Sequence, residues 1–242
     1  MEINVYKTED ELLSAFANFF IKTVQNAIAE RGAFNVVLSG GNSPKKLYEL
    51  LASSSYNKKM DWKKLFFFFG DERCVPQDDN ENNARMVQQA LFDPLHISSN
   101  QIFKIDTSLP PHEAAAKYMH VITDHFKERE PSFDLIILGL GENSHTASLF
   151  PYYKVLTETS ATVKEIFLQD ENRYRITMTA PLINLAHHIA FLVYGKGKAE
   201  AVHHVLKDKT DIQKYPAQLI RSVNGDLQWF LDEASARLIK AF

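Results

Sequence analysis

The chain has 242 residues, of which 45% are hydrophobic, and a formal net charge of −3. A chain of this length can bury roughly 70% or more of the surface that it exposes when unfolded, so its core needs no disulfide or metal ion. The 27 basic and 30 acidic residues give no excess of positive charge of the kind that binds nucleic acid. The single cysteine, Cys74, excludes an intramolecular disulfide framework and favours a reducing compartment.

The amino-terminal residues carry no recognisable targeting signal. Met1 to Asp10 lacks the basic segment and the apolar core of a signal peptide, and no apolar run approaches the roughly 20 residues that span a bilayer. We therefore expect a cytoplasmic protein that binds neither membrane nor nucleic acid. From the sequence we expect a monomer or a small homo-oligomer.

Segments with helical spacing alternate with short apolar runs along the chain. The first, Glu9 to Glu30, carries a stripe of apolar residues and ends at Arg31-Gly32, as an amphipathic helix does. Further helices are predicted at Ser43 to Ala52, Asn82 to Phe92, Pro111 to Glu130, Ala180 to Ala186, Lys198 to Leu206 and Asp232 to Ile239. Strands are predicted at Phe34 to Leu38, Leu65 to Phe69, Gln101 to Ile105, Phe133 to Leu138, Thr162 to Leu168, Tyr174 to Thr177, Ile189 to Tyr194 and Leu227 to Leu231.

This alternation is typical of βαβ units and predicts an α/β fold, a mostly parallel sheet flanked by helices. No linker rich in proline, glycine or serine interrupts it, so we expect residues 1–242 to form a single domain. In open sheets of this class, ligands bind beyond the carboxyl ends of the strands. The loops that follow the strands are therefore where we look for chemistry.

The loop Ser39-Gly-Gly-Asn-Ser-Pro44 separates a predicted strand from a helix. Gly40 and Gly41 let backbone N–H groups approach an anion, and Ser43 can cap the helix. The loop lacks the lysine of the nucleotide-binding pattern G-x-x-x-x-G-K-[ST]. It is either a phosphate cradle or an ordinary tight turn with a good cap.

The loop Gly70 to Pro76 is dense in charge and follows four consecutive phenylalanines. Charged groups at the end of a buried strand are costly unless they pair with one another or face a polar ligand. Arg73 can bind a carboxylate, a phosphate or a developing oxyanion, or it can join neighbouring loops through an ion pair. Nothing marks Cys74 as an activated nucleophile, and we expect a packed side chain.

The loop Gly139 to Pro151 places His145 among small residues. Its pattern Gly139-x-Gly141-x-x-Ser144 imitates the dinucleotide fingerprint, but a serine stands in place of the third glycine. No G-x-S-x-G nucleophile elbow occurs in the chain. His145 is then the candidate general acid or base, because imidazole titrates near neutral pH; a structural role is the alternative.

Basic residues and histidines elsewhere give two further expectations. Arg175 and Lys198 lie in or just after predicted strands, where each can reach an anion at the same edge of the sheet. The neighbouring pairs His187-His188 and His203-His204 should point in diverging directions, and neither has the H-x-x-x-H spacing of a helical zinc site. We therefore expect no metal site.

Together these motifs resemble the 6-phosphogluconolactonases, whose fold is shared with the glucosamine-6-phosphate deaminases. The resemblance runs from about Ser39 to Asp232. It rests on Ser39-Gly-Gly-Asn-Ser-Pro44, Gly70-Asp-Glu-Arg-x-Val-Pro76, Gly139-Leu-Gly-x-x-x-His-Thr-Ala-Ser-Leu-Phe-Pro151, Arg175-Ile-Thr-x-Thr179 and Gly195-x-x-Lys198. It implies hydrolysis of 6-phosphoglucono-1,5-lactone, the second step of the oxidative pentose phosphate pathway, without a cofactor or an essential metal.

The resemblance also implies roles for individual residues. His145, Arg73 and Asp71 are expected to be catalytic, with His145 activating water. The residues expected to bind the phosphosugar are Gly40, Gly41, Asn42, Ser43, Asn143, Arg175 and Lys198. Two positions depart from the family pattern: Asn143-Ser144 stands where Asp-Gly is usual, and Asn42-Ser43 stands where Ser-Thr or Thr-Thr is typical.

Two other functions remain open from the sequence. A deaminase or isomerase of an amino-sugar phosphate has related loops, but these run toward Met-Asp-Glu-Tyr and Gly-His-Ile-Ala-Phe-Asn-Glu-Pro. This chain has Arg73 in place of the tyrosine and Thr146-Ala-Ser-Leu-Phe-Pro151 in place of the second motif, which favours the lactonase. A non-enzymatic sugar-phosphate binding protein is the third possibility, although such sensors usually carry a helix-turn-helix that we do not find before Ser39.

Overall fold

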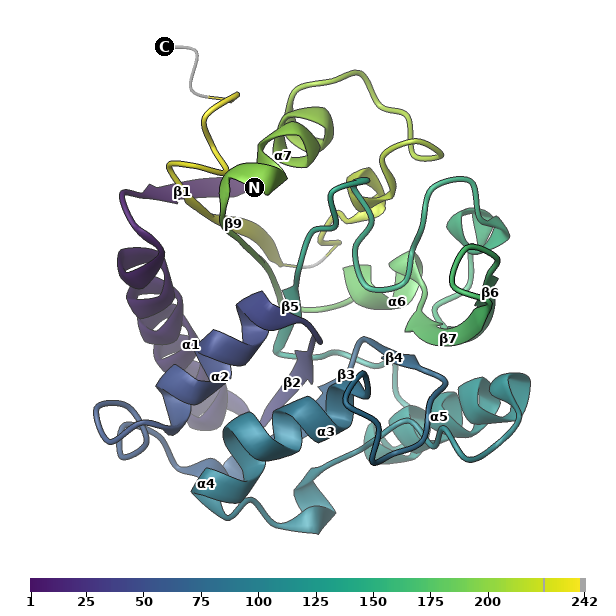
Figure 1. Cartoon of the computed structure of the whole chain (residues 1–242). Coiled ribbons are helices and arrows are strands. Elements are labelled where there is room, and N and C mark those ends of the chain that lie inside the picture. The colour runs from purple at the N-terminus through teal and green to yellow at the C-terminus, as the bar shows by residue number, and fades with distance from the viewer. Residues whose placement is uncertain (224, 240–242) are drawn as a thin grey trace.

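A computed structural model describes residues 1–223 and 225–239 of the chain. Its centre is a six-stranded sheet in the order β1-β9-β8-β5-β2-β3, and every neighbouring pair is parallel. These strands are β1 Glu2–Tyr6, β2 Phe34–Leu38, β3 Leu65–Phe69, β5 Leu135–Leu138, β8 His188–Val193 and β9 Asp226–Asp232. Figure 1 shows the sheet flanked by helices. The predicted α/β fold with a mostly parallel sheet is therefore confirmed.

A second, antiparallel sheet in the order β4-β7-β6 stands beside the first. Its strands are β4 Asp71–Arg73, β6 Val163–Leu168 and β7 Arg173–Met178. Only Gly70 separates β4 from β3, so the chain passes directly from the central sheet into the smaller one. The smaller sheet thus carries charged residues to the carboxyl edge of the central sheet.

The helices lie in the connections between strands (Figure 1). They are α1 Glu9–Arg31, α2 Asn42–Ala52, α3 Asn83–Val87, α4 Asp93–Leu95, α5 Pro111–His125, α6 Ala180–Asn184 and α7 Ala199–Leu206. Short 3₁₀ turns occur at Trp62–Lys64, Ser99–Gln101, Lys154–Thr157, Lys196–Lys198 and Pro216–Leu219, and a π-helical turn at Gln88–Phe92. None of the helices formed by residues 1–223 and 225–239 is long and apolar enough to cross a membrane.

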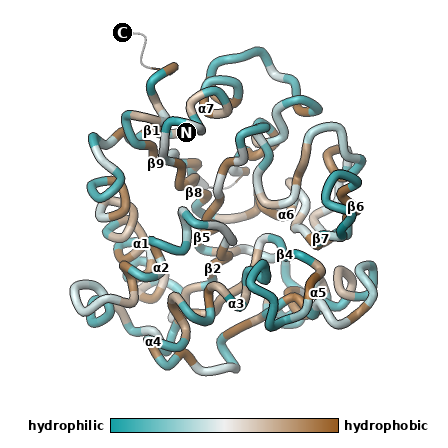
Figure 2. The backbone as a smooth tube through the Cα atoms, in the orientation of Figure 1, coloured by the Kyte–Doolittle hydropathy of each residue, from teal (hydrophilic) through white to brown (hydrophobic). Residues whose placement is uncertain are grey.

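The hydrophobic core lies along the central strands, which Figure 2 shows as the most hydrophobic part of the tube. Both faces of β5 are buried, as expected for a parallel strand that helices cover on each side. Helix α1 is capped at its start by Thr8, whose hydroxyl accepts the Glu11 N–H, and at its end by Gly32, with φ of 81°. Its apolar stripe includes Leu12, Phe16 and Phe20, all buried.

Two buried tyrosines fix the carboxyl ends of neighbouring strands. The Tyr48 hydroxyl of α2 donates to the Ser39 carbonyl (2.9 Å) and accepts its N–H (3.0 Å). The Tyr118 hydroxyl of α5 does the same at Phe69, accepting its N–H at 2.7 Å. Because an unpaired buried backbone group is costly, these hydroxyls stabilise the strand ends that lead into the candidate site.

Several predicted elements differ from the structure. Residues 101–105 do not form a strand, because only one parallel bridge, Phe67 to Ile102, joins them to β3. The predicted helix Asp232 to Ile239 is a series of turns instead: the Asp232 carboxylate accepts the Ser235 N–H, and the Ser235 hydroxyl lies against the Val193 and Asp232 carbonyls. Helix α5 ends at His125, before the predicted Glu130.

Candidate active site

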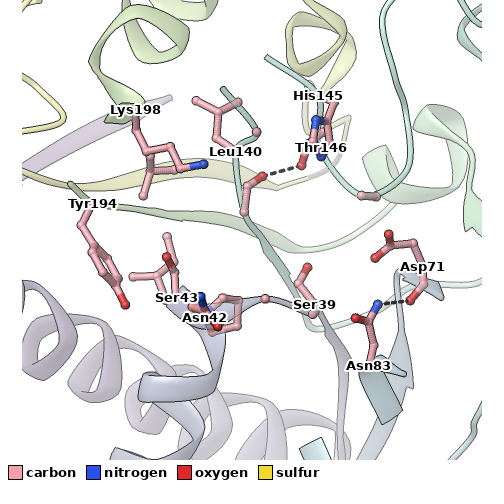
Figure 3. A pocket seen from close by; sticks show the side chains of 18 of the residues that line it. Ser39, Asn42, Ser43, Asp71, Asn83, Leu140, His145, Thr146, Tyr194 and Lys198 are labelled. Atoms are coloured by element: carbon pink, nitrogen blue, oxygen red, sulfur yellow. Dashed lines mark hydrogen bonds between the residues drawn. The ribbon is translucent and has the colours of Figure 1, made fainter. Parts of the chain in front are cut away.

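A cavity of about 350 Å³ opens beyond the carboxyl ends of β2, β3, β5 and β8. Its volume falls within the range of small-molecule sites. Figure 3 shows side chains from all four strand ends pointing toward one space. The lining residues are Ser39, Gly40, Gly41, Asn42, Ser43, Pro44, Asp71, Arg73, Asn83, Gly139, Leu140, Gly141, His145, Thr146, Ala147, Arg175, Leu192, Val193, Tyr194 and Lys198. Of the site residues predicted from the sequence, all but Asn143 line this cavity.

One end of the cavity is the amino terminus of α2. The helix is capped by Gly41, at φ of 102°, so Ser43 lies in its first turn and is not the N-cap that the sequence predicted. The Ser43 side chain instead lines the cavity. Free backbone N–H groups and the helix dipole at such an end attract an anion. Gly40 is required for a different reason, since a Cβ there would lie 1.8 Å from Asn83 Oδ1.

The loop after β5 holds His145 through its own backbone. The Gly141 N–H donates to the His145 carbonyl at 2.8 Å, and the Thr146 hydroxyl donates to the Gly139 carbonyl at 2.8 Å. A Cβ on Gly141 would lie 2.1 Å from His145 Nδ1, so a side chain at that position displaces the ring. The other face of the imidazole stacks on Phe150, with 4.1 Å between ring centroids.

Asn143 determines which nitrogen of His145 carries the proton. Its Oδ1 lies within hydrogen-bond distance of His145 Nδ1 and also accepts the His145 backbone N–H at 3.3 Å. An amide oxygen only accepts, so Nδ1 carries the hydrogen and Nε2 keeps its lone pair. Asn143 itself borders a neighbouring hollow. The next residue, Ser144, has φ of 64°. Glycine adopts this conformation without strain, which explains why the family pattern has glycine at this position.

The surroundings of His145 keep its imidazole neutral. Burial, and then the positive charges of Arg175 and Lys198, lower the pKa of His145 to about 4. The negative charge of Glu171 raises this pKa, and the positive charge of Arg73 lowers it further. A histidine with a lowered pKa is unprotonated at neutral pH and can accept a proton.

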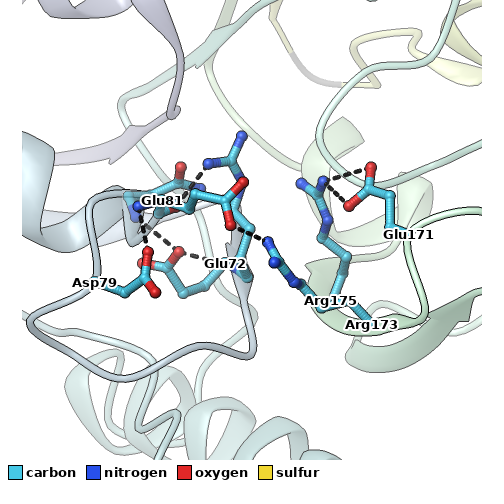
Figure 4. Close-up of polar contacts among 8 residues, drawn as sticks. Glu72, Asp79, Glu81, Glu171, Arg173 and Arg175 are labelled. Carbon is cyan, nitrogen blue, oxygen red and sulfur yellow. Dashed lines mark hydrogen bonds and ion pairs between the residues drawn. The ribbon is translucent and has the colours of Figure 1, made fainter.

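Arg73 and Arg175 face each other across β4 and β7 as register partners. Like charges placed directly opposite on neighbouring strands repel each other, and the Nε atoms of both side chains are buried without a hydrogen-bond partner among residues 1–223 and 225–239. Arg73 Nη1 donates to the Glu81 carbonyl, and Arg175 pairs with Glu171 at 2.6 Å (Figure 4). The two guanidinium groups therefore line one side of the cavity with positive charge, which suits a polar or anionic ligand.

An ion pair on this side of the cavity is made by Arg173, whereas Arg73 itself contacts Glu81 through the backbone carbonyl. Arg173 pairs with Glu81 across the gap between β7 and the loop before α3 (Figure 4).

The two acidic residues of β4 differ in role. The Asp71 carboxylate lines the cavity and accepts the Ser148 hydroxyl at 2.6 Å. Glu72 points away from it.

Glu72 fixes the start of α3. Its carboxylate accepts the backbone N–H groups of Arg73, Asn83 and Ala84, each at 2.8 or 2.9 Å. Burial raises the pKa of Glu72 to about 7, while these three hydrogen bonds act to lower it. Burial likewise raises the pKa of the Cys74 thiol to about 11, which agrees with a packed, unreactive cysteine.

Two polar residues of the cavity lie outside every motif that the sequence analysis singled out. Tyr194 is the residue between β8 and Gly195, and its side chain points toward Ser43 (Figure 3). The rule that strand ends bear ligand-binding residues would have found it. Asn83 donates from Nδ2 to the Asp71 carbonyl at 3.0 Å and packs against Gly40. Its position depends on packing between α3 and two other loops, and no local pattern indicates it.

Comparison with known proteins agrees with this geometry. The family model described as glucosamine-6-phosphate isomerases/6-phosphogluconolactonase matches residues 7–229. A 6-phosphogluconolactonase of Synechocystis is 37% identical over 221 residues, which are 90% of this chain and 89% of that protein. The structure of 6-phosphogluconolactonase from Trypanosoma cruzi superposes with a TM-score of 0.88 at 26% identity, covering 99% of this chain and 97% of the other.

A monomeric glucosamine-6-phosphate deaminase also has the same fold, with a TM-score of 0.83 at 19% identity over 98% of this chain and all of that one (100%). The fold alone therefore does not distinguish the two activities. The sequence matches and the arrangement of loops at the carboxyl edge of the sheet lead to one conclusion. This chain belongs to the glucosamine-6-phosphate isomerase/6-phosphogluconolactonase family.

Proposed function

We infer that this family member is a 6-phosphogluconolactonase, which hydrolyses 6-phosphoglucono-1,5-lactone to 6-phosphogluconate. The observation that carries the inference is His145, a neutral imidazole whose Nδ1 is occupied by Asn143 and whose surroundings hold three cationic side chains. A δ-lactone is an ester, so its hydrolysis needs a base for water and a donor for the oxyanion that develops at the carbonyl. Both kinds of group line one cavity.

The phosphate of the substrate is proposed to bind at the α2 end of the cavity. The backbone N–H groups at Gly41 to Ser43 and the helix dipole suit a dianion, and Lys198 adds a positive charge from the start of α7. Binding energy gained at the phosphate, which does not react, then holds the lactone ring at the other end. The roles of Gly40, Asn42 and Arg175 in holding the sugar belong to the same proposal.

The reaction proceeds in two proton transfers. His145 Nε2 takes a proton from water as the water oxygen forms a bond to C1, and the electron pair of the carbonyl moves to its oxygen. Arg73 donates hydrogen bonds to this oxyanion, and Asp71 orients the sugar hydroxyls. As the oxyanion collapses, the bond from C1 to the ring oxygen breaks, and His145 returns the proton to that oxygen. Asn143 keeps Nε2 available for both transfers.

The amino-sugar deaminase is the second candidate, and one observation disfavours it. Arg175, Lys198 and Arg73 lower the pKa of His145 and Glu171 raises it, so the charges around the ring are positive on balance. An amino sugar carries an ammonium group, which these cations repel, whereas a lactone carbonyl develops negative charge.

A direct assay separates the two activities. The purified protein is offered the lactone and, in parallel, glucosamine 6-phosphate, and the release of acid and of ammonia is measured above the spontaneous rates. We expect lactone hydrolysis alone. Ammonia release without lactone hydrolysis would assign the deaminase activity instead, and binding of both sugars without turnover would identify a sensor.

We place the protein in the cytoplasm as one domain that forms a monomer or a small homo-oligomer and acts without a cofactor. Size-exclusion chromatography with light scattering measures the assembly state, and dialysis against a chelator tests the activity without metal ions.

A further inference from the structure

A cluster of two histidines and one aspartate lies at the end of α7, outside the site described above. His203 and His204 occupy the last turn of this helix, and Asp208 follows just after it. Adjacent histidines were expected to diverge, but both Nδ1 atoms face the same carboxylate. His204 Nδ1 lies 2.7 Å from Asp208 Oδ2, and His203 Nδ1 lies 3.5 Å from Asp208 Oδ1.

The spacing of these atoms matches a transition-metal site. The three ligand atoms lie within 4.8 Å of one another, and residues 1–223 and 225–239 contain no other group of three that does so. Zinc binds imidazole nitrogen and carboxylate oxygen at about 2.0–2.2 Å, which places two ligands of a tetrahedral ion roughly 3.3 Å apart. The two observed nitrogen–oxygen distances lie on either side of this value. The three ligand atoms lie within 4.8 Å of one another, so rotation of the side chains would close the remaining separation around an ion.

The ligands are already oriented by their neighbours. The His204 ring stacks on Tyr215, with 4.6 Å between centroids and 10° between planes. Its backbone carbonyl accepts the Gln218 side chain at 3.0 Å. The hydrogen bond from His204 and the nearby His203 lower the pKa of Asp208, so the carboxylate is ionised and ready to coordinate. Pre-oriented ligands of this kind favour metal binding.

We propose that His203, His204 and Asp208 bind one divalent transition-metal ion of the zinc class. Two imidazoles and one carboxylate suit zinc, cobalt or nickel, and three protein ligands leave a coordination position for water. The ion would take the place of the hydrogen-bonding protons between the imidazoles and the carboxylate. Metal binding would then compete with protons and weaken as the histidines become charged.

Such an ion would connect α7 to the segment 207–219. This segment reaches the His145 loop through two backbone hydrogen bonds, from Ala217 N–H to the Ser144 carbonyl and from Tyr152 N–H to the Gln213 carbonyl, each 3.0 Å long. A bound metal ion would therefore stabilise the segment 207–219, which supports the loop that holds His145. The site is independent of the reaction that we propose for the cavity.

The test is a titration of the metal-free protein with Zn²⁺ by calorimetry, and with Co²⁺ by visible absorption. We expect one equivalent to bind, with affinity reduced about tenfold or more in each of His203→Gln, His204→Gln and Asp208→Asn. Zn²⁺ at about 100 times its dissociation constant should raise the melting temperature by about 5 °C in the parent protein and not in Asp208→Asn.

Two control variants make the outcome decisive. His188→Gln removes a histidine that pairs with a single aspartate, Asp226, and should leave Zn²⁺ binding unchanged. His145→Ala removes the imidazole of the cavity, the competing place for a metal ion. Retention of the bound equivalent in His145→Ala supports the α7 site. Loss of binding in that variant, equal affinity in Asp208→Asn, or no saturable binding by the folded parent protein would overturn the proposal.

Discussion

The two ends of the cavity are built in different ways. At the α2 end, the proposed phosphate site uses backbone N–H groups that one short loop, Gly40 to Ser43, presents by itself. The other end consists of side chains from β4, β7 and the loop after β5, which meet only because two sheets are joined at Gly70. The first end suits the phosphate of many sugars. The second end is where we propose that the reaction takes place.

Removal of the imidazole affects only the second end and should give the largest effect. General-base catalysis contributes about 10²–10⁴-fold, so His145→Ala should reduce kcat by that order. Binding of 6-phosphogluconate should change little, because the phosphate contacts at α2 remain. Calorimetry with the product and steady-state kinetics measure the two quantities. A variant that turns over at the parent rate would remove His145 from the mechanism.

A methyl group on Gly141 should disturb the same end without removing any catalytic group. The new Cβ would lie 2.1 Å from His145 Nδ1, so the ring must move, and a displacement of about 1 Å can cost 10²-fold in rate. We expect Gly141→Ala to lower kcat by about this factor.

Gly139→Ala is the matched control for this substitution. A Cβ at Gly139 meets no described atom within 4 Å, so a much smaller loss is expected. Equal losses in the two variants would show that the loop, rather than the ring position, is what matters.

Removal of a cation from the α2 end should affect binding more than turnover. A charge-assisted hydrogen bond contributes about 1.5–3 kcal/mol, so Lys198→Ala should raise KM by about 10- to 100-fold while kcat stays within a fewfold of the parent. Kinetics on the lactone test this directly. A fall in kcat with KM unchanged would place Lys198 at the reacting end instead.

Restoration of the carboxylate that is usual beside the catalytic histidine should shift the pH dependence. An adjacent negative charge stabilises the imidazolium, so Asn143→Asp should raise the pKa of His145 from about 4 by about 1–3 units. The base is then protonated at higher pH, and kcat/KM falls sooner on the acid side. Ionisation of the substrate phosphate affects both enzymes equally, so the difference between their pH profiles isolates His145. Superimposable profiles would contradict the contact.

The difference between the two ends also explains what the sequence could predict. The glycine loop and His145 were found because each follows a buried apolar strand, a purely local pattern. The short strand β4 was missed because its residues are Asp71, Glu72 and Arg73, which pair with β7 far along the chain. The edge strand β1 was missed because, within residues 1–223 and 225–239, it pairs only with β9 and exposes Ile3 and Val5.

Long-range packing accounts for the other errors. The polar residues after β9 resemble a helix in spacing, yet Asp232 and Ser235 form a turn that also bonds to Val193. His203 and His204 appeared to diverge because adjacent residues on a regular helix do so. The i,i+4 spacing of His204 and Asp208 indicates their contact, but the helix ends at Leu206, and the turn that follows lets the same carboxylate reach His203 as well.

We propose that the phosphate of the substrate lies at α2 and that the reacting carbon lies at His145. The most direct test is a crystal structure with 6-phosphogluconate bound. We expect the phosphate within hydrogen-bond distance of the backbone N–H groups at Gly41 to Ser43 and of Lys198, with the C1 carboxylate beside His145 Nε2 and Arg73. A phosphate held between Arg73 and Arg175, with C1 at α2, would contradict this account.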